Sequence, residues 1–189
     1  MLWESSKPVS IPDTGRAFPI ALEHVKLPCE VDVVAFPELC ETPYLRARTI
    51  WSHDKPLLAG PVMVLRDSEH MGQFVMDHKD PGDRLDLSFG MIDTLSVRRE
   101  MSKRTLNKDA ARPKQECKIL HYVSNTSDAT QQIRIVERVA PELEAIIKTP
   151  QPGKPDEGGL IESELTLEPH QTIQLKLTYE IDARAATIF

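Results

Sequence analysis

Apolar and polar residues alternate along much of this chain, and this pattern predicts short β-strands. The alternation is strict over residues 84–89, where Leu85, Leu87 and Phe89 fall on one face and polar residues fall on the other. A period of two residues is typical of an antiparallel strand with one buried face. The same pattern is regular over residues 172–181, which form the clearest predicted strand near the end of the chain.

Turn-forming residues separate the predicted strands. The segment Asp80-Pro81-Gly82-Asp83 has proline and glycine in the order that a type II turn requires. Fifteen prolines against eight glycines argue against long helices, because an interior proline removes a hydrogen bond and clashes with the preceding turn. The strands predicted in this way cover residues 42–51, 61–66, 71–77, 84–89, 95–100, 117–123, 132–139, 143–147, 160–167 and 172–181.

The alternation also predicts which side chains share a face. Within residues 42–51, Leu45 and Ala47 fall on one face, whereas Arg46 and Arg48 fall on the other. Successive side chains of a strand point to opposite faces of the sheet, so we expect the apolar set toward the core. The residues expected in the core of the first half are Leu57, Leu58, Leu85, Leu87 and Phe89.

Residues 101–115 differ from the predicted strands around them. They are polar and show no periodic apolar face, which is typical of a long exposed connection and of a boundary within the chain. The strand and turn pattern before this stretch recurs weakly after it. We therefore predict an all-β protein, an antiparallel, immunoglobulin-like β-sandwich with two halves in tandem, residues 1–103 and 104–189. The alternative is one extended β-sandwich domain over residues 1–189.

Composition and charge restrict the class of protein and its partners. With 40% apolar and 28% charged residues, the 189 residues are enough for a packed core. The net charge of −6 disfavours nucleic acid and anionic membrane surfaces as partners. No stretch approaches the roughly 20 apolar residues that a membrane span requires, so none is predicted. The first residues lack a secretory signal pattern, which leaves the compartment open between the cytoplasm and, for a fragment, the cell envelope.

Motifs for metal binding and catalysis are weak. The three cysteines have no C-x-x-C spacing and are expected as free thiols, with a Cys29–Cys40 disulfide as the alternative. The histidine spacing fits no zinc motif. Asp13-Thr14-Gly15 lacks the second carboxylate motif of an aspartic protease, so a surface turn is favoured. The sequence therefore predicts no catalytic residues, no metal site and no cofactor.

Several segments carry a resemblance to a known family. They are P-V-S-I-P-D-T-G at residues 8–15, F-P-E-L-C-E-T-P-Y-L-R-A-R at 36–48, K-P-L-L-A-G-P-V-M-V-L-R-D at 55–67 and L-S-F-G-M-I-D-T-L-S-V-R-R-E at 87–100. A later segment, G-G-L-I-E-S-E-L-T-L-E-P-H-Q-T-I-Q-L-K-L-T-Y-E-I at residues 158–181, looks like the end of the same domain. On these segments, residues 9–181 resemble the C-terminal domain of unknown function of mucoidy inhibitor A-type proteins. The resemblance implies a bacterial protein linked to suppression of exopolysaccharide-overproducing growth. It implies no known reaction and no catalytic residues.

Positive charge gathers near residues 98–118 of this otherwise acidic chain. One interpretation is a docking surface for an anionic partner, such as an acidic polysaccharide or the acidic face of a protein. The favoured alternative is a solvated loop with flanking charges that protect sheet edges. Trp51 and Tyr44 are candidates for stacking on a sugar, although a role in the core is favoured. The candidate binding residues are Arg98, Arg99, Lys103, Arg104, Lys108, Arg112 and Lys114.

These observations favour a non-catalytic β-sandwich interaction or scaffold module of a mucoidy-inhibitor-like protein, linked to the cell envelope or to exopolysaccharide. Exposed loops or sheet edges would hold its partner, a protein or an acidic polysaccharide. The alternative is a polymer-acting hydrolase with a site between the two halves. A cleft in which His, Asp or Glu converge with strongly shifted pKa values would favour the hydrolase. The oligomeric state is left open.

Overall fold

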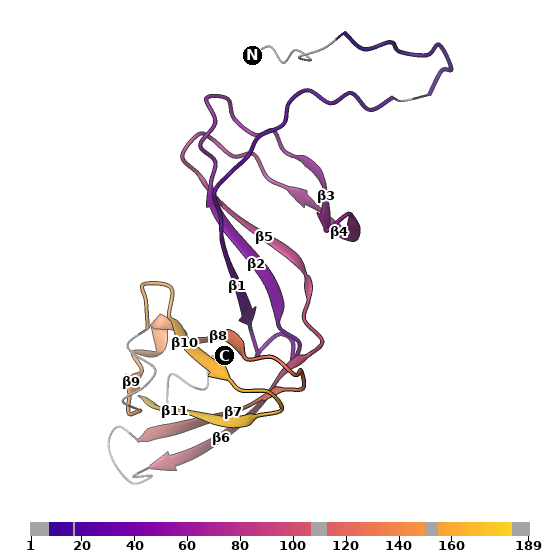
Figure 1. Cartoon of the computed structure of the whole chain (residues 1–189). Coiled ribbons are helices and arrows are strands. Elements are labelled where there is room, and N and C mark those ends of the chain that lie inside the picture. Colours follow the sequence, from indigo (N-terminus) through magenta and orange to yellow (C-terminus); the bar gives the residue numbers. More distant parts are fainter. Residues whose placement is uncertain (1–7, 17, 107–112, 150–154, 183–189) are drawn as a thin grey trace.

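The computed structural model describes residues 8–16, 18–106, 113–149 and 155–182 (Figure 1). Apart from one 3-10 turn at Pro141–Leu143, every regular element in these ranges is a β-strand. Two larger sheets and a separate two-stranded sheet contain them. The prediction of an all-β sandwich is therefore confirmed, whereas its immunoglobulin-like type stays a prediction.

One layer of the sandwich is a four-stranded sheet with the order β6-β7-β11-β9. It consists of β6 (Leu95–Leu106), β7 (Lys114–Asn125), β11 (Thr172–Asp182) and β9 (Ile146–Ile147). All of its pairings are antiparallel. The alternation expected over residues 172–181 is confirmed in β11, because every second side chain toward its C-terminal end is buried.

The opposite layer is a five-stranded sheet with the order β10-β8-β1-β2-β5. Neighbouring strands are antiparallel except β1 and β8, which run parallel. A parallel pair needs a long connection between its strands, and here β2 to β7 lie between β1 and β8 in the chain. The strands are β1 (Glu30–Ala35), β2 (Tyr44–Ile50), β5 (Arg84–Met91), β8 (Gln131–Arg138) and β10 (Leu160–Leu167).

The main core lies between these two sheets. Ile119 of β7 and Leu177 of β11 share a buried cluster with Ile161 of β10. Val123 of β7 shares a second cluster with Ile135 of β8. Full burial of such a side chain stabilises the fold by about 1.5–3 kcal/mol. The apolar faces of β6, β7 and β11 packed against those of β1, β8 and β10 therefore hold the sandwich together.

A smaller core lies at the far end of β2 and β5, where a hairpin packs against the sheet (Figure 1). β3 (Gly60–Arg66) and β4 (Glu69–Met76) form this hairpin. Trp51, Met76 and Leu85 make its buried cluster. Trp51 is only 6% exposed, and its indole N–H donates to a backbone carbonyl at 2.7 Å, so the ring is a core residue, as favoured from the sequence.

The core expected for the first half is confirmed in part. Leu85 is buried, and Leu57 and Leu87 pack against its cluster while half-buried. The assignment of Leu58 to the core is wrong, because its side chain is 56% exposed. Leu57 forms a β-bridge with Lys79, and the next side chain in extended backbone points to the opposite face. Phe89 is half-buried.

Both ends of the stretch expected to be a long connection belong to β-strands. β6 continues to Leu106, β7 begins at Lys114, and their ladder extends to the pair that these two residues form. The expectation of irregular chain is therefore wrong for residues 101–106 and 114–115. A strand ladder is made by backbone groups, so a polar sequence forms it when a neighbouring strand is in register.

Strands from both expected halves of the chain share one sheet. β1 lies beside β8, which joins strands from the two sides of residue 103. The division into residues 1–103 and 104–189, and the alternative of one domain over residues 1–189, both stay predictions.

Candidate functional site

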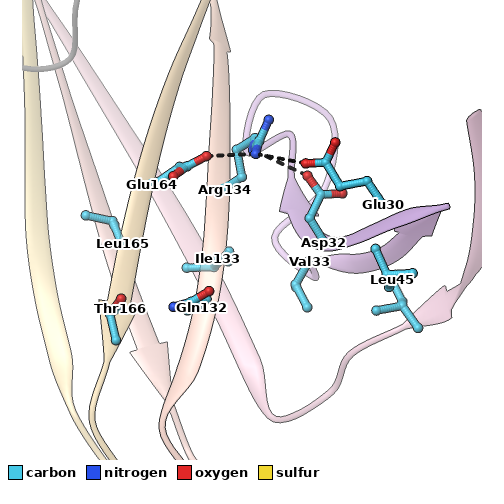
Figure 2. A pocket seen from close by; sticks show the side chains of 11 residues that line it. Glu30, Asp32, Val33, Leu45, Gln132, Ile133, Arg134, Glu164, Leu165 and Thr166 are labelled. Carbon is cyan, nitrogen blue, oxygen red and sulfur yellow. Dashed lines mark hydrogen bonds and ion pairs between the residues drawn. The ribbon is translucent and has the colours of Figure 1, made fainter. Parts of the chain in front are cut away.

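A cleft opens where β1 and β8 separate, and Figure 2 shows it between the two strands. Across the described part of the chain, β1 and β8 pair only at Val34↔Arg134 and Ala35↔Ile135. Toward the start of both strands the ladder ends and leaves a cleft of about 640 Å³. This volume lies in the range of roughly 300–1,000 Å³ that is usual for ligand pockets.

The cleft has an apolar side and a polar side. Because side chains alternate along a strand and the cleft opens between two strands, residues from both faces of the sheet line it. Its apolar lining consists of Val31, Val33, Leu45, Ile133 and Leu165. Its polar lining consists of Glu30, Asp32, Gln132, Arg134, Glu164 and Thr166.

Asp32 is the centre of an ion-pair network on the polar side. Its carboxylate accepts hydrogen bonds from Arg46 Nε at 3.0 Å and from Arg46 Nη2 at 2.7 Å. Arg48 Nη2 and Arg134 Nε each lie 3.3 Å from the same carboxylate. Burial alone would raise the pKa of Asp32, but the hydrogen bonds from Arg46 and the three positive charges outweigh it and lower this pKa. Asp32 is therefore held as a carboxylate.

Arg134 spans the mouth of the cleft (Figure 2). On the β10 side, its guanidinium donates to Glu162 at 2.9 Å and to Glu164 at 2.7 Å. On the β1 side, it reaches Glu30 at 3.8 Å in addition to Asp32. Arg134 of β8 thus connects β10 with β1 across the mouth of the cleft.

The network carries an excess of negative charge. Three arginines, at positions 46, 48 and 134, face four carboxylates, at positions 30, 32, 162 and 164, so the sum is minus one. The side chains of Glu30 and Glu164 are 63% and 73% exposed. Their carboxylates remain accessible to a ligand although each already pairs with an arginine.

The edge of β8 that faces the cleft carries backbone hydrogen-bonding groups. Val139 N–H donates to Gly159 O at 2.8 Å and continues the ladder between β8 and β10. Hydrogen-bonding direction alternates along a strand, so odd-numbered residues of β8 face β10. The N–H and C=O of Gln132 therefore point toward β1, beyond the last β1–β8 pair.

The edge of β1 is turned toward the cleft by the same rule. Trp51 N–H donates to Asp83 O at 2.8 Å, which continues the ladder between β2 and β5. Even-numbered residues of β2 therefore face β1, and the register pairs them with even-numbered residues of β1. The N–H and C=O of Val31 consequently point into the cleft, opposite those of Gln132.

The structure separates the residues of the candidate basic patch. Arg98 is exposed, lies 3.3 Å from Glu100 and has its guanidinium 4.6 Å from the Tyr122 ring centroid. Lys103 and Arg104 are exposed toward the end of β6. Lys114 is 3.7 Å from Glu180, and Lys108 and Arg112 lie outside the described residues. A role for this surface in binding stays a prediction.

Arg99 differs from the rest of the patch because its side chain points between the two sheets. Its Nη2 donates to Glu137 Oε1 at 2.7 Å, and its own side chain is only 19% exposed. His121 Nε2 lies 2.8 Å from the other oxygen of the same carboxylate. Burial alone would raise the pKa of Glu137, but the hydrogen bonds from His121 and Arg99 lower it. This buried network connects β6 and β7 with β8.

The remaining candidate sites contain no metal centre within the ranges that the structure describes. No group of three or more His, Cys, Asp or Glu side chains is arranged to hold an ion there. All three cysteines are free, as expected, with Cys29 and Cys40 exposed and Cys117 buried. Tyr44 stacks on Phe36 at a centroid distance of 6.1 Å. No helix of the described chain is long and apolar enough to cross a membrane.

No protein-family model, curated protein or solved structure matches this chain. The cleft was not predicted from the sequence, but one signal for its charged side was present. Arg46 and Arg48 were expected on one face of their strand, and Glu162 and Glu164 have the same spacing in the strand predicted at residues 160–167. The sequence does not indicate that β1, which supplies Asp32, lies between β2 with its two arginines and β10 with its two glutamates.

Proposed function

We propose that this chain is a non-catalytic β-sandwich interaction module that holds a partner in the cleft between β1 and β8. The observation that carries the proposal is the combination of three features in one cleft: an apolar lining, accessible charges and strand edges. Strand edges supply main-chain hydrogen bonds to a partner, and side-chain pockets supply specificity.

The charge of the cleft favours a protein over an acidic polysaccharide as the partner. The network around Asp32 has one more carboxylate than arginine, and a polyanion would meet exposed Glu30 and Glu164. Like charges brought together at an interface disfavour binding. An acidic polysaccharide would have to use the exposed cations of β6, Arg98, Lys103 and Arg104, instead.

The ionised state of Asp32 favours a binding role for this carboxylate over a role as a general acid. A carboxyl group that acts as a general acid near neutral pH needs a raised pKa. The pKa of Asp32 is lowered, because Arg46 donates to both of its oxygens. This arrangement suits a fixed charge that orients a ligand, and it does not suit Asp32 as the general acid of a hydrolase.

The family resemblance gives this module its biological setting. Residues 9–181 resemble a domain of mucoidy inhibitor A-type proteins, and an all-β interaction module is compatible with a scaffold role near the bacterial envelope or exopolysaccharide machinery. We propose this setting on the resemblance, and the partner class on the cleft.

A crosslinking experiment tests the proposed function. The tagged chain is expressed in its native host, crosslinked and purified beside a double variant, Glu30→Gln with Glu164→Gln. We expect a protein that is enriched with the wild type and lost with the double variant. Equal enrichment with both forms would show that the partner binds outside the cleft. Degradation of a purified polymer by the wild type would favour a hydrolase.

A further inference from the structure

We propose that the partner is an extended peptide strand with alternating apolar residues and one basic residue, which inserts between β1 and β8. The inserted segment would convert the five-stranded sheet into a six-stranded one. This inference rests on the proposed function and names its partner class. Three independent features of the cleft carry it.

The first feature is the pair of strand edges that face each other. Val31 on β1 and Gln132 on β8 both turn their N–H and C=O groups into the cleft, beyond the position where the β1–β8 ladder ends. An inserted strand is the ligand that satisfies backbone groups on two walls at once, because its own groups alternate between its two sides. A sugar or a small metabolite has no hydrogen-bonding groups that repeat along two opposite sides.

The second feature is the apolar lining on the sandwich side of the cleft. Val33, Ile133 and Leu165 line the cleft there, and Ile133 itself belongs to the main core. A strand placed between β1 and β8 presents every second side chain to this lining. Apolar residues at alternate positions would extend the core and remove these side chains from water.

The third feature is the charge on the outer side. The other side chains of an inserted strand would lie among Glu30, Asp32, Arg134 and Glu164. Asp32 is already neutralised by Arg46, whereas Glu30 of β1 and Glu164 of β10 remain exposed beside the cleft. One lysine or arginine on the ligand would balance the single excess negative charge, while an acidic ligand would add to it.

Fluorescence anisotropy with labelled heptapeptides tests this proposal. The probe is Thr-Val-Lys-Val-Thr-Val-Thr, titrated with the full chain. One control replaces lysine with glutamate, and a second places proline at the central position, which removes a strand N–H. We expect saturable binding of the probe, and binding about tenfold weaker for the glutamate peptide. We expect no binding of the proline peptide.

Variants of the chain locate the binding site. Glu164→Gln removes an exposed carboxylate of the cleft and should weaken probe binding severalfold with an unchanged melting temperature. Val31→Pro removes an N–H that faces the cleft and should abolish binding, while circular dichroism shows an intact sheet. Glu157→Gln removes the same charge from an exposed turn and serves as the matched control, with unchanged binding.

The outcomes separate this inference from the proposed function. No binding of the probe, or equal binding of all three peptides, overturns the inserted strand. Unchanged probe affinity in Glu164→Gln and Val31→Pro also overturns it. If the crosslinked partner is nevertheless lost in the Glu30→Gln/Glu164→Gln double variant, the interaction function stands with a different ligand. If that partner is retained as well, both proposals fail.

Discussion

Two charged networks on β8 show how the same chemistry serves different purposes. Glu137 points between the sheets, where Arg99 and His121 donate to it, and the Glu137 and His121 side chains are 3% and 2% exposed. Arg134, three residues earlier, points outward and joins partly exposed carboxylates of β10 with the carboxylates of β1 across the cleft. Removing one member of a buried network leaves an uncompensated buried charge, which destabilises the fold. Exposed ion pairs contribute little to the free energy of unfolding. The buried network therefore fixes the packing of the sheets, and the outer one leaves charge available to a ligand.

The largest expected effect comes from breaking the buried network. Glu137→Ala should destabilise the fold by about 3–5 kcal/mol, because Arg99 and His121 then lose their shared acceptor inside the sandwich. Urea unfolding followed by circular dichroism measures this change. Glu162→Ala is the matched control, since Glu162 pairs with Arg134 at the surface and its loss should change stability by less than about 1 kcal/mol. Similar losses in the two variants would contradict the comparison.

The pH dependence of stability should also reflect the buried network. The pKa of Glu137 is lowered from its usual 4.5 in the folded chain. The contribution of Glu137 to the free energy of unfolding is therefore fully present above pH 4.5. It is lost as the pH falls through the lower pKa that Glu137 has in the folded chain. Urea unfolding between pH 3 and pH 6 should show this loss in the wild type and a flatter profile in Glu137→Gln. Parallel profiles would mean that Glu137 does not cause the acid sensitivity.

An intermediate effect is expected at the centre of the outer network. Asp32→Asn keeps the shape of the side chain but removes its charge and one of its two acceptor oxygens. Arg46 therefore loses one of its two hydrogen bonds, and the other loses its ionic character. Hydrogen bonds to charged groups contribute about 1.5–3 kcal/mol, and partial exposure places the expected loss near the lower end. Thermal unfolding measures the loss. A destabilisation as large as that of Glu137→Ala would show that both networks are structural.

The smallest effect on stability is expected at the accessible end of the outer network. Glu164→Gln should change the unfolding free energy by less than about 0.5 kcal/mol, because its carboxylate is largely exposed. The same variant is expected to weaken binding of the lysine heptapeptide. Differential scanning fluorimetry and anisotropy on one preparation measure both quantities. A variant that loses stability and binds the peptide normally would reverse the assigned roles of the two networks.

The sequence predicted where the strands lie in the chain better than which strands pair with one another. Alternation placed Arg46 and Arg48 on the face opposite Leu45 and Ala47, and in the structure both arginines meet Asp32 while Ala47 is buried. A strand pattern gives the face of a side chain but not the strand beside it. The parallel β1–β8 pair, on which the cleft depends, joins residues about 100 positions apart and leaves no local signal.

Arg98 and Arg99 also show that a strand pattern gives the face of a side chain but not its partner. Both were assigned to one basic patch, yet neighbouring residues of a strand point to opposite faces. Arg98 lies at the surface near Tyr122, whereas Arg99 reaches Glu137, which is 38 residues further along the chain. Alternation could have separated the two arginines. The buried acceptor could not have been found, because nothing in the local sequence indicates that β8 packs over β6.

Residue-resolved hydrogen exchange of the free chain tests most directly whether the two strand edges are open. Val31 and Gln132 direct their N–H groups into the cleft, whereas Asp32 and Ile133 direct theirs toward β2 and β10. We expect fast exchange at Val31 and Gln132 and strong protection at Asp32 and Ile133 in the same spectrum. Equal protection of all four amides would contradict it, since the edges would then already be paired and no strand could insert.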